Sequence, residues 1–299
     1  MASGQMGPTR SGRLYIVGTP IGNLGDLTPR AASAFESADA VCCEDTRVTS
    51  KLMAHLGISK PLIRCDENVI ADRAPQIVDR LLAGETIAFA ADAGMPSVSD
   101  PGQALVDAAR DAGVDVEVIP GPSACVTALV SSGISCDNFF FGGFLPRKHG
   151  ERVRRLRQLA FVPGALVFYE SPHRAEASLA ALAEVFPARV VALCRELTKL
   201  HEEVLRAPAP DLHRMVLERG DMRGEMVIVV APPDEGESTL PMALEVDVQG
   251  DREAALRRDI EEALAQGEAV SAMAKRLAQR HSLKKREVYE RILEVQGGC

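Results

Sequence analysis

Two carboxylates and an arginine stand together in the segment Glu44-Asp45-Thr46-Arg47, directly after the apolar run Ala40–Cys43. One interpretation is a capped helix start in which Glu44 and Arg47 form an i, i+3 ion pair. The other is an active-site cluster in which Arg47 binds a phosphate and a carboxylate accepts a proton. The spacing alone leaves both interpretations open.

Three loops rich in glycine and proline follow three further β-type runs. Their sequences are GTPIGNLGD (18–26), DAGMPSVSDPG (92–102) and PGPSA (120–124). Ligands of open α/β sheets bind at the carboxyl ends of strands, so we expect the loops to form one crevice. In the last loop, Ser123 either caps the following helix or presents its hydroxyl and amide to a ligand. The first loop fits neither GxGxxG nor GxxxxGK[ST], which argues against a pyrophosphate cradle.

The second half of the chain carries charged segments at equivalent places. FYESPHR (168–174), RELTKLHEE (195–203) and RGEM (223–226) follow or precede apolar runs. None of them supplies a Ser/His/Asp order or a His/Asp/Glu set with metal-ligand spacing. The sequence therefore predicts no metal site and no nucleophilic triad.

Short β-branched runs alternate with helical patterns along most of the chain. Between two of them, Ala74, Ile77, Val78, Leu81 and Leu82 follow the spacing of one helix face. Strands separated by helices give parallel sheets, so the predicted fold class is α/β. The predicted strands are Leu14–Val17, Ala40–Cys43, Thr86–Ala90, Val116–Ile119, Ala165–Tyr169, Arg189–Cys194 and Met226–Val230.

Breaks in composition divide the chain into five parts. We expect a loose tail at 1–13, an α/β lobe at 14–138, a second α/β lobe at 139–231, a linker at 232–250 and a helical module at 251–299. The linker is predicted because it is acidic and proline-bearing. The module resembles a helix-turn-helix unit. Its predicted core is Val270, Met273, Ala274, Leu277, Val288, Tyr289 and Ile292.

Composition narrows the class of protein. The chain has 299 residues, a net charge of −8 and 46% hydrophobic residues, which excludes a wholly disordered or fibrous chain. No apolar run approaches the roughly 20 residues of a membrane span. The start has basic residues without an apolar segment behind them, so we predict no secretory signal. Seven unevenly spaced cysteines without a CxxC pair indicate neither a disulfide framework nor a zinc ribbon. We expect a reduced, cytoplasmic protein.

Two basic segments interrupt the acidic chain. Residues 147–157 carry six Arg or Lys against one Glu, and residues 275–291 carry seven against two Glu. Each is open to interpretation as a solvated helix face. Together they favour a polyanionic partner.

Eight motifs in register carry a resemblance to a known family. They are GTPIGNLGD, EDTR, DAGMPSVSDPG, PGPSA, FLPRK, FYESPHR, RELTK and GEMV, within residues 14–231. The chain resembles the small-subunit ribosomal RNA methyltransferases of the tetrapyrrole methylase superfamily. The resemblance implies a homodimer of two α/β lobes, not a Rossmann fold, with S-adenosylmethionine held between the lobes and a C-terminal helical module. It implies methyl transfer to the ribose 2′-hydroxyl of a cytidine in the decoding region of 16S ribosomal RNA, without a metal.

The resemblance also implies which residues touch the cofactor. They are Pro20, Ile21, Asp92, Met95, Pro96, Ser97, Val98, Ser123, Ala124, Tyr169, Leu197 and Glu225. It identifies no catalytic residue. Charge type and position beside the cleft make Asp45 or Glu44 the candidate base, with Arg47 and Lys148 holding phosphates or lowering the pKa of the hydroxyl.

The basic segments become candidate RNA contacts on this interpretation. In the first, these are Arg147, Lys148, Arg152, Arg154, Arg155 and Arg157, and in the module Lys284, Lys285 and Arg286. One alternative is a tetrapyrrole C-methyltransferase, which has no need of EDTR, FYESPHR, the basic segments or the module. Another is a non-catalytic regulator that reads DNA with the helix-turn-helix unit, which leaves the three loops without a purpose.

Overall fold

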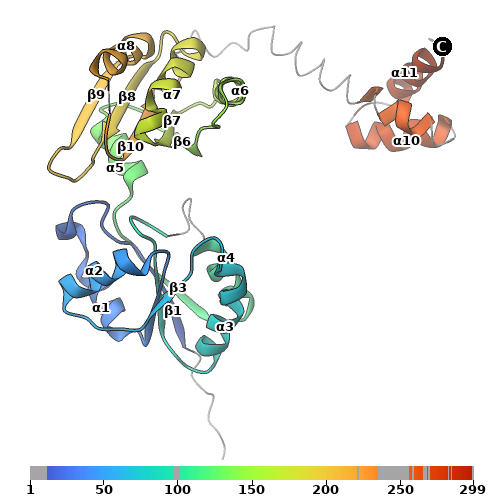
Figure 1. The fold of residues 1–299 in the computed structure, drawn as a ribbon. Helices are drawn as coiled ribbons and strands as arrows, with labels where there is room; N and C mark the ends of the chain where they lie inside the picture. The colour runs from blue at the N-terminus through green and yellow to red at the C-terminus, as the bar shows by residue number, and fades with distance from the viewer. Residues whose placement is uncertain are drawn as a thin grey trace, which may run out of the picture. The chain divides into compact units, whose positions relative to one another are not determined.

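The computed structural model describes residues 12–96, 102–220, 222–234, 256–257, 259–264, 268, 270–281, 283 and 285–297. By its internal contacts the chain divides into two units, Met1–Pro233 and Asp234–Cys299. The first unit contains two sheets, each with helices packed on it (Figure 1). The second unit is helical.

The first sheet is entirely parallel, as the alternation of strands and helices predicts. Its strands are β1 (Arg13–Val17), β2 (Ala40–Cys43), β3 (Leu62–Arg64), β4 (Ile87–Ala90) and β5 (Asp115–Ile119), in the order β3-β2-β4-β1-β5. Four of these strands were predicted to within one residue at each end. The fifth, β3, has only three residues, too few for a period-2 pattern to show.

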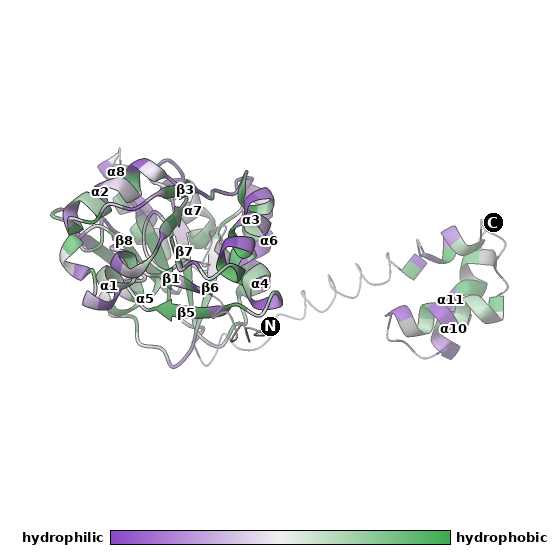
Figure 2. Cartoon of the chain, turned by 90° about the horizontal axis from the view of Figure 1, so that it is seen from below, coloured by the Kyte–Doolittle hydropathy of each residue, from purple (hydrophilic) through white to green (hydrophobic). Residues whose placement is uncertain are grey.

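Helices cover both faces of this sheet. The helices α3 (Ile70–Leu82) and α4 (Gly102–Asp111) bury Ile77 and Leu105 against one face. On the other face lie α1 (Pro29–Ser37) and α2 (Thr46–Leu56), which bury Phe35 and Met53. A short 3-10 turn, η1 (Leu24–Asp26), precedes α1. Figure 2 shows the hydrophobic colour concentrated on the strands, with the hydrophilic colour on the outer helices. Of the predicted stripe on α3, Ala74, Ile77 and Leu81 are buried, Val78 is only partly buried, and Leu82 is exposed.

The second sheet is mixed, so the expectation of a parallel sheet is wrong for this lobe. Its strands are β6 (Phe139–Phe144), β7 (Ala165–Glu170), β8 (Val190–Arg195), β9 (Glu203–Pro208) and β10 (Met226–Val230), in the order β6-β7-β10-β8-β9. Only β6 and β7 pair in parallel. The strand β10 inserts antiparallel between β7 and β8, and β9 returns antiparallel along β8 after a short connection. Two strands joined through a helix pair in parallel only if they become neighbours in the sheet, and β10 separates β7 from β8.

Three helices cover one face of the second sheet, and one covers the other. The first three are α6 (His149–Leu159), α7 (Pro172–Val185) and α8 (Ala209–Arg219). The fourth is α5 (Ala124–Ser131), which follows β5 of the first sheet but packs against β7 and β10. The predicted lobe boundary at 138/139 assigns α5 to the first lobe, whereas by packing the second lobe begins with this helix.

The helical unit has a core of its own. Its long helices are α10 (Val270–His281) and α11 (Lys285–Gly297). The predicted core is confirmed at five of its seven positions, where side chains are buried: Met273, Ala274, Leu277, Val288 and Ile292. Val270 is partly buried. Tyr289 was predicted wrongly, since 43% of it is exposed, and Leu256, Ile260 and Ala263 complete the core instead.

Neither a membrane-spanning helix nor a disulfide occurs within the described ranges. No helix within them has the length and apolar character needed to cross a membrane. The six cysteines that fall within them are all free thiols, five of them buried.

Candidate functional site

The three glycine- and proline-rich loops meet at one edge of the first sheet, as predicted. They follow β1, β4 and β5, which are neighbours in the sheet. Thr19 and Gly94 join two of the loops by exchanging backbone hydrogen bonds of 2.9 and 3.1 Å. The backbone N–H of Gly121 donates to Sδ of Met95 at 3.2 Å, which joins the third loop.

Glycine is required where the first and third loops touch. A Cβ atom on Gly18 would lie 2.6 Å from the backbone nitrogen of Gly121, and one on Gly121 would lie 2.7 Å from the carbonyl carbon of Gly18. Backbone on both sides leaves no flexible group to move aside. The two glycines therefore fix how closely the loops after β1 and β5 approach each other.

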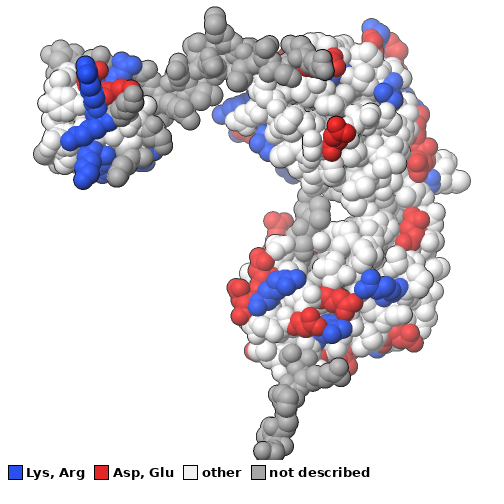
Figure 3. Space-filling model, turned by 180° about the vertical axis from the view of Figure 1, so that it is seen from behind, with Lys and Arg blue, Asp and Glu red and all other residues white. Residues whose placement is uncertain are grey.

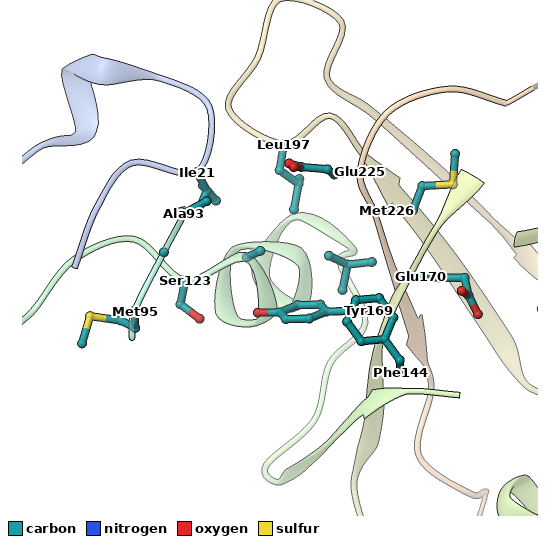
Figure 4. Close-up of a pocket in the computed structure, with 13 residues that line it drawn as sticks. Ile21, Ala93, Met95, Ser123, Phe144, Tyr169, Glu170, Leu197, Glu225 and Met226 are labelled. Carbon is teal, nitrogen blue, oxygen red and sulfur yellow. The ribbon is translucent and has the colours of Figure 1, made fainter. Parts of the chain in front are cut away.

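A cavity of about 240 Å³ lies between these loops and the second sheet. Its lining from the first lobe includes Ile21 and Met95, and its lining from the second includes Tyr169, Leu197 and Glu225. In Figure 4 the Tyr169 hydroxyl points toward Ser123, while Leu197 and Glu225 lie together on another side of the space. Ile21 also packs with Leu197 in the hydrophobic cluster under the second sheet. Both lobes thus build the cavity.

The cavity combines an aromatic wall with a helix N-terminus. Phe141 and Phe144 hold the Tyr169 ring edge-on, at centroid distances of 4.7 and 5.8 Å. Burial raises the pKa of the Tyr169 hydroxyl. Ser123 occupies the N-cap position of α5 but its side chain makes no capping hydrogen bond. Of the two roles predicted for Ser123, capping by the hydroxyl is wrong, and the side chain lines the cavity instead.

A second cavity, of about 370 Å³, adjoins the first and shares Ile21, Ala93 and Glu225 with it. It is lined by the loops after β1 and β4, by α2, and by the connection between β8 and β9. Four ionisable side chains line it: Lys51, Asp92, Lys199 and Glu225.

The structure distributes the twelve predicted cofactor residues unevenly. Pro20 and Asp92 line the second cavity, and Pro96 is buried and lines neither. Ser97 and Val98 lie outside the described residues. Seven line the first cavity: Ile21, Met95, Ser123, Ala124, Tyr169, Leu197 and Glu225.

The Glu44–Arg47 cluster contains a capped helix start. Its ion pair joins Asp45 and Arg47, whereas the capped-helix interpretation predicted a pair of Glu44 and Arg47. Asp45 is the N-cap of α2, and its carboxylate accepts from the backbone N–H of Arg47 at 2.8 Å and from its Nε at 3.0 Å. These hydrogen bonds lower the pKa of Asp45 to about 2. Such a carboxylate is a weak base. The side chain of Arg47 is 87% exposed.

The same cluster positions Asp92. The backbone N–H of Asp45 donates to Oδ1 of Asp92 at 3.0 Å, and the N–H of Asp92 donates to Oε1 of Glu44 at 3.2 Å. Partial desolvation raises the pKa of Asp92. Glu44, Asp45 and Arg47 line neither cavity, whereas Asp92 lines the second.

Only some of the basic side chains in the segment 147–157 are exposed to solvent. Lys148 is the N-cap of α6, 82% exposed, and pairs with Glu151 at 3.3 Å; it lines neither cavity. The prediction that Arg152 contacts RNA is wrong, because this side chain is buried and donates to the carbonyls of Pro146 and Arg147 at 3.1 Å each. Burial lowers the pKa of its guanidinium.

Glu170 places a buried carboxyl group beside Arg174 and near Arg152. Its side chain is fully buried, lies 3.2 Å from Nε of Arg174, and accepts from the Ser178 hydroxyl. Arg174 also donates to the carbonyl of Leu145. The two guanidiniums therefore hold the 145–147 backbone, next to Phe144 of the cavity wall.

The remaining basic residues are more open. Arg154 is exposed, Arg155 stacks on Phe140 at 5.8 Å, and Arg157 pairs with Glu184 at 3.4 Å. In the helical unit Lys284 lies outside the described residues, and Lys285 and Arg286 are exposed on α11. Figure 3 shows Lys and Arg side chains forming a band across one face of that unit.

Sequence reasoning did not select Lys51, Phe144, Glu170 or Lys199 as site residues. The charged RELTK segment directly after a strand was a signal for Lys199, and Phe144 stands next to the FLPRK motif. Glu170 belongs to the FYESPHR motif, which was likewise a signal, whereas Lys51 carried none separable from an ordinary helix. In the described ranges no group of three His, Cys, Asp or Glu residues is arranged to hold a metal ion.

Comparisons with known proteins agree with this geometry. The family model of the Tetrapyrrole (Corrin/Porphyrin) Methylases matches residues 13–213. A protein of Xylella fastidiosa named ribosomal RNA small subunit methyltransferase I is 46% identical over 224 residues, which cover 73% of this chain and 81% of the relative. A protein of the same name from a Synechocystis strain is 37% identical and covers 95% of this chain and 99% of its own length.

Solved structures share the fold at lower identity. Uroporphyrin-III C-methyl transferase from Thermus thermophilus, complexed with S-adenyl homocysteine, aligns with a TM-score of 0.54 and 20% identity. The alignment covers 74% of this chain and 97% of that one. At this identity the likeness concerns the arrangement of the two lobes.

Proposed function

Because the chain belongs to the ribosomal RNA small subunit methyltransferase I family of the tetrapyrrole methylases, we propose that it methylates small-subunit ribosomal RNA. In detail, the proposed reaction transfers a methyl group from S-adenosylmethionine to the ribose 2′-hydroxyl of a cytidine in the decoding region. The predicted homodimer and cytoplasmic location belong to the same proposal.

The observation that carries the proposal is the cavity built by both lobes. Seven of the residues that the family resemblance gives to the cofactor line this one space. The cavity offers what a folded adenosyl sulfonium needs: apolar walls from Ile21 and Leu197, the Tyr169 ring, and the hydroxyl of Ser123 at the start of α5. The carboxylate of Glu225 suits the hydroxyls of a ribose. These residues fit S-adenosylmethionine.

The bound cofactor supplies an already activated methyl group, so the protein needs no metal or covalent intermediate. The chain's own residues have to orient the acceptor hydroxyl and remove its proton. Correct orientation alone contributes on the order of 7–11 kcal/mol at best. For proton removal, the sequence offers Glu44 or Asp45. The pKa of Asp45 is lowered to about 2 by Arg47, which makes Asp45 a weak base, and neither Glu44 nor Asp45 lines a cavity.

Exposed basic side chains give the protein places to hold the RNA backbone. Arg147, Lys148 and Arg154 are exposed near the 145–148 turn, and Lys285 and Arg286 are exposed on α11. A net charge of −8 limits affinity for arbitrary RNA. We therefore propose that a structured ribosomal subunit, rather than free RNA, is the substrate.

A tetrapyrrole C-methyltransferase is not favoured. The solved tetrapyrrole enzyme shares the fold at 20% identity, whereas the two relatives named for ribosomal RNA share 46% and 37%. The relatives named for ribosomal RNA therefore lie much nearer in sequence.

Methyl-labelled S-adenosylmethionine and purified subunits test the proposal. Small ribosomal subunits from cells without this activity are the substrate, and free small-subunit rRNA and uroporphyrinogen III are the parallel acceptors. We expect label in the rRNA of the subunits and none in uroporphyrinogen. Label in the tetrapyrrole alone, or an equal rate on free rRNA, would overturn the substrate assignment.

A further inference from the structure

The connection between β8 and β9 holds one lysine in an unusually constrained place. In this connection Glu196 and Thr198 have φ angles of 52° and 67°, the left-handed region that glycine favours. Thr198 is β-branched, so this backbone conformation is strained. The strained residues flank Leu197 of the first cavity and precede Lys199 of the second.

Two glycines make room for the side chains of Lys199 and Glu196. A Cβ on Gly22, where φ is +148°, would lie 2.6 Å from Cγ of Lys199. A Cβ on Gly224, where φ is +91°, would collide with the carboxylate of Glu196. Both glycines thus leave space for the Lys199 side chain and its partner.

The Lys199 ammonium is charged and has one hydrogen-bond donor left. It donates to Oε1 of Glu196 at 2.8 Å and to Oε2 of Glu225 at 3.1 Å. An ammonium has three donors, so these two bonds leave one. Desolvation acts to lower the pKa of Lys199, but the hydrogen bonds to the two carboxylates outweigh it and raise the pKa. Lys199 is therefore a cation and not a base at neutral pH.

This ammonium lies at the border of the two cavities. Lys199 lines the second cavity, and its partner Glu225 lines both. Its side chain is 29% exposed, so it is partly withdrawn from bulk water. A cation in such a place stabilises negative charge that develops on an oxygen more strongly than in water.

The second cavity is also lined by the carboxylate of Asp92, a group that can accept a proton. Asp92 is anchored through Oδ1 by the backbone N–H of Asp45. Lys199, which also lines this cavity, pairs with the carboxylates of Glu196 and Glu225. The carboxylate of Asp45 lies outside the cavity lining and pairs with Arg47. Among the residues that the structure describes, Asp92 has no ion-pair partner, and partial desolvation raises its pKa.

We propose that the second cavity receives the acceptor ribose, with Lys199 as the catalytic cation that faces its hydroxyl and Asp92 as the proton acceptor. The inference rests on the proposed function. The O–H bond breaks and its proton passes to the Asp92 carboxylate. An electron pair of the oxygen forms the new O–C bond as the S–C bond breaks, with that bond's pair returning to sulfur. Lys199 stays protonated and stabilises the developing alkoxide.

The test measures steady-state methylation of small ribosomal subunits together with S-adenosylmethionine affinity by calorimetry. We expect Lys199→Gln to lower kcat about 10²-fold, as for loss of one oxyanion donor. Asp92→Asn, which keeps the amide oxygen for the Asp45 N–H, should lower kcat by 10²-fold or more. Both should retain the cofactor affinity and the KM for subunits within about threefold. Lys199→Arg keeps the charge and should regain part of the rate.

Matched substitutions of the same type outside the cavities are the controls. Lys60→Gln and Asp111→Asn remove the same charges from residues that line neither cavity, and should retain wild-type rates. The rate of Asp92→Asn should also rise with pH between 7 and 9, because hydroxide replaces the lost base, while that of the wild type stays nearly level.

The outcomes separate the inference from the proposed function. Wild-type protein that binds S-adenosylmethionine but labels no subunit would remove the proposed function. An active wild type together with wild-type kcat in Lys199→Gln or Asp92→Asn would overturn the inference alone. Loss of cofactor binding in Lys199→Arg and Lys199→Gln alike would make the lysine a cofactor residue, which also overturns it.

Discussion

Glu170→Gln should destabilise the first unit far more than any single surface charge does. The Glu170 side chain is fully buried between a buried Arg152 and the mostly buried Arg174, and it lies 3.2 Å from Nε of Arg174. Glutamine keeps the size but removes the negative charge that pairs with Arg174 and acts electrostatically on Arg152. Breaking a buried ion pair by removing one partner costs about 3–5 kcal/mol. For a unit of this size, that corresponds to a fall in Tm of about 6–20 °C.

Thermal and urea unfolding, followed by circular dichroism, measure this difference. Glu184→Gln is the control, because Glu184 pairs with His149 and Arg157 at 3.2 and 3.4 Å with 44% of its side chain exposed. Surface pairs of this kind contribute about 0.2–1 kcal/mol. If Glu170→Gln cost no more than Glu184→Gln, the buried cluster would not hold the 145–147 backbone as argued.

Four further predictions follow from the site and the helical unit. Tyr169→Ala removes the aromatic wall of the first cavity and should weaken S-adenosylmethionine binding at least tenfold by calorimetry, whereas unchanged affinity would place the cofactor elsewhere. Gly22→Ala should displace Lys199 and lower kcat while the fold, followed by Tm, is largely retained. A wild-type rate would show that the loop adapts. Asp45→Asn should destabilise the protein at pH 7. The difference in unfolding free energy between wild type and variant should shrink as pH falls from about 3.8 through about 2. The reason is that a carboxylate with a lowered pKa stabilises the fold only while it is ionised. A pH-independent difference in urea unfolding would contradict that cause. Met273→Ala should cost about 2–5 kcal/mol and raise hydrogen exchange throughout α10 and α11 while leaving the first unit protected, since Met273 is fully buried in the separate helical core.

Local patterns in the sequence were sufficient for most elements of the fold. Runs such as Ala40–Cys43 and Met226–Val230 are continuous and apolar because helices or loops cover both faces, and their limits were predicted to the residue. The pairing of β10 between β7 and β8 was not predictable in this way. Pairing depends on which strands become neighbours after the chain returns, and no short pattern encodes that.

Side-chain direction explains the site residues that were misjudged. Arg152 and Arg154 stand two positions apart on α6, one buried beneath the 145–147 backbone and the other exposed, although both belong to one basic run. Tyr289 was predicted to belong to the core of the helical unit together with Val288 and Ile292, but it points outward and is 43% exposed. The RELTK segment marked the region of Lys199, but the exact place of its ammonium depends on two left-handed residues and on two glycines from distant segments.

The most direct test of the proposed function is the chemical form of the transferred methyl group. After reaction with subunits that lack the modification, the labelled small-subunit rRNA is digested to nucleosides and its alkali-resistant positions are mapped. The account predicts label in 2′-O-methylcytidine at one position in the decoding region, with no label in a base. Label in a methylated base, or spread over many positions, would contradict it.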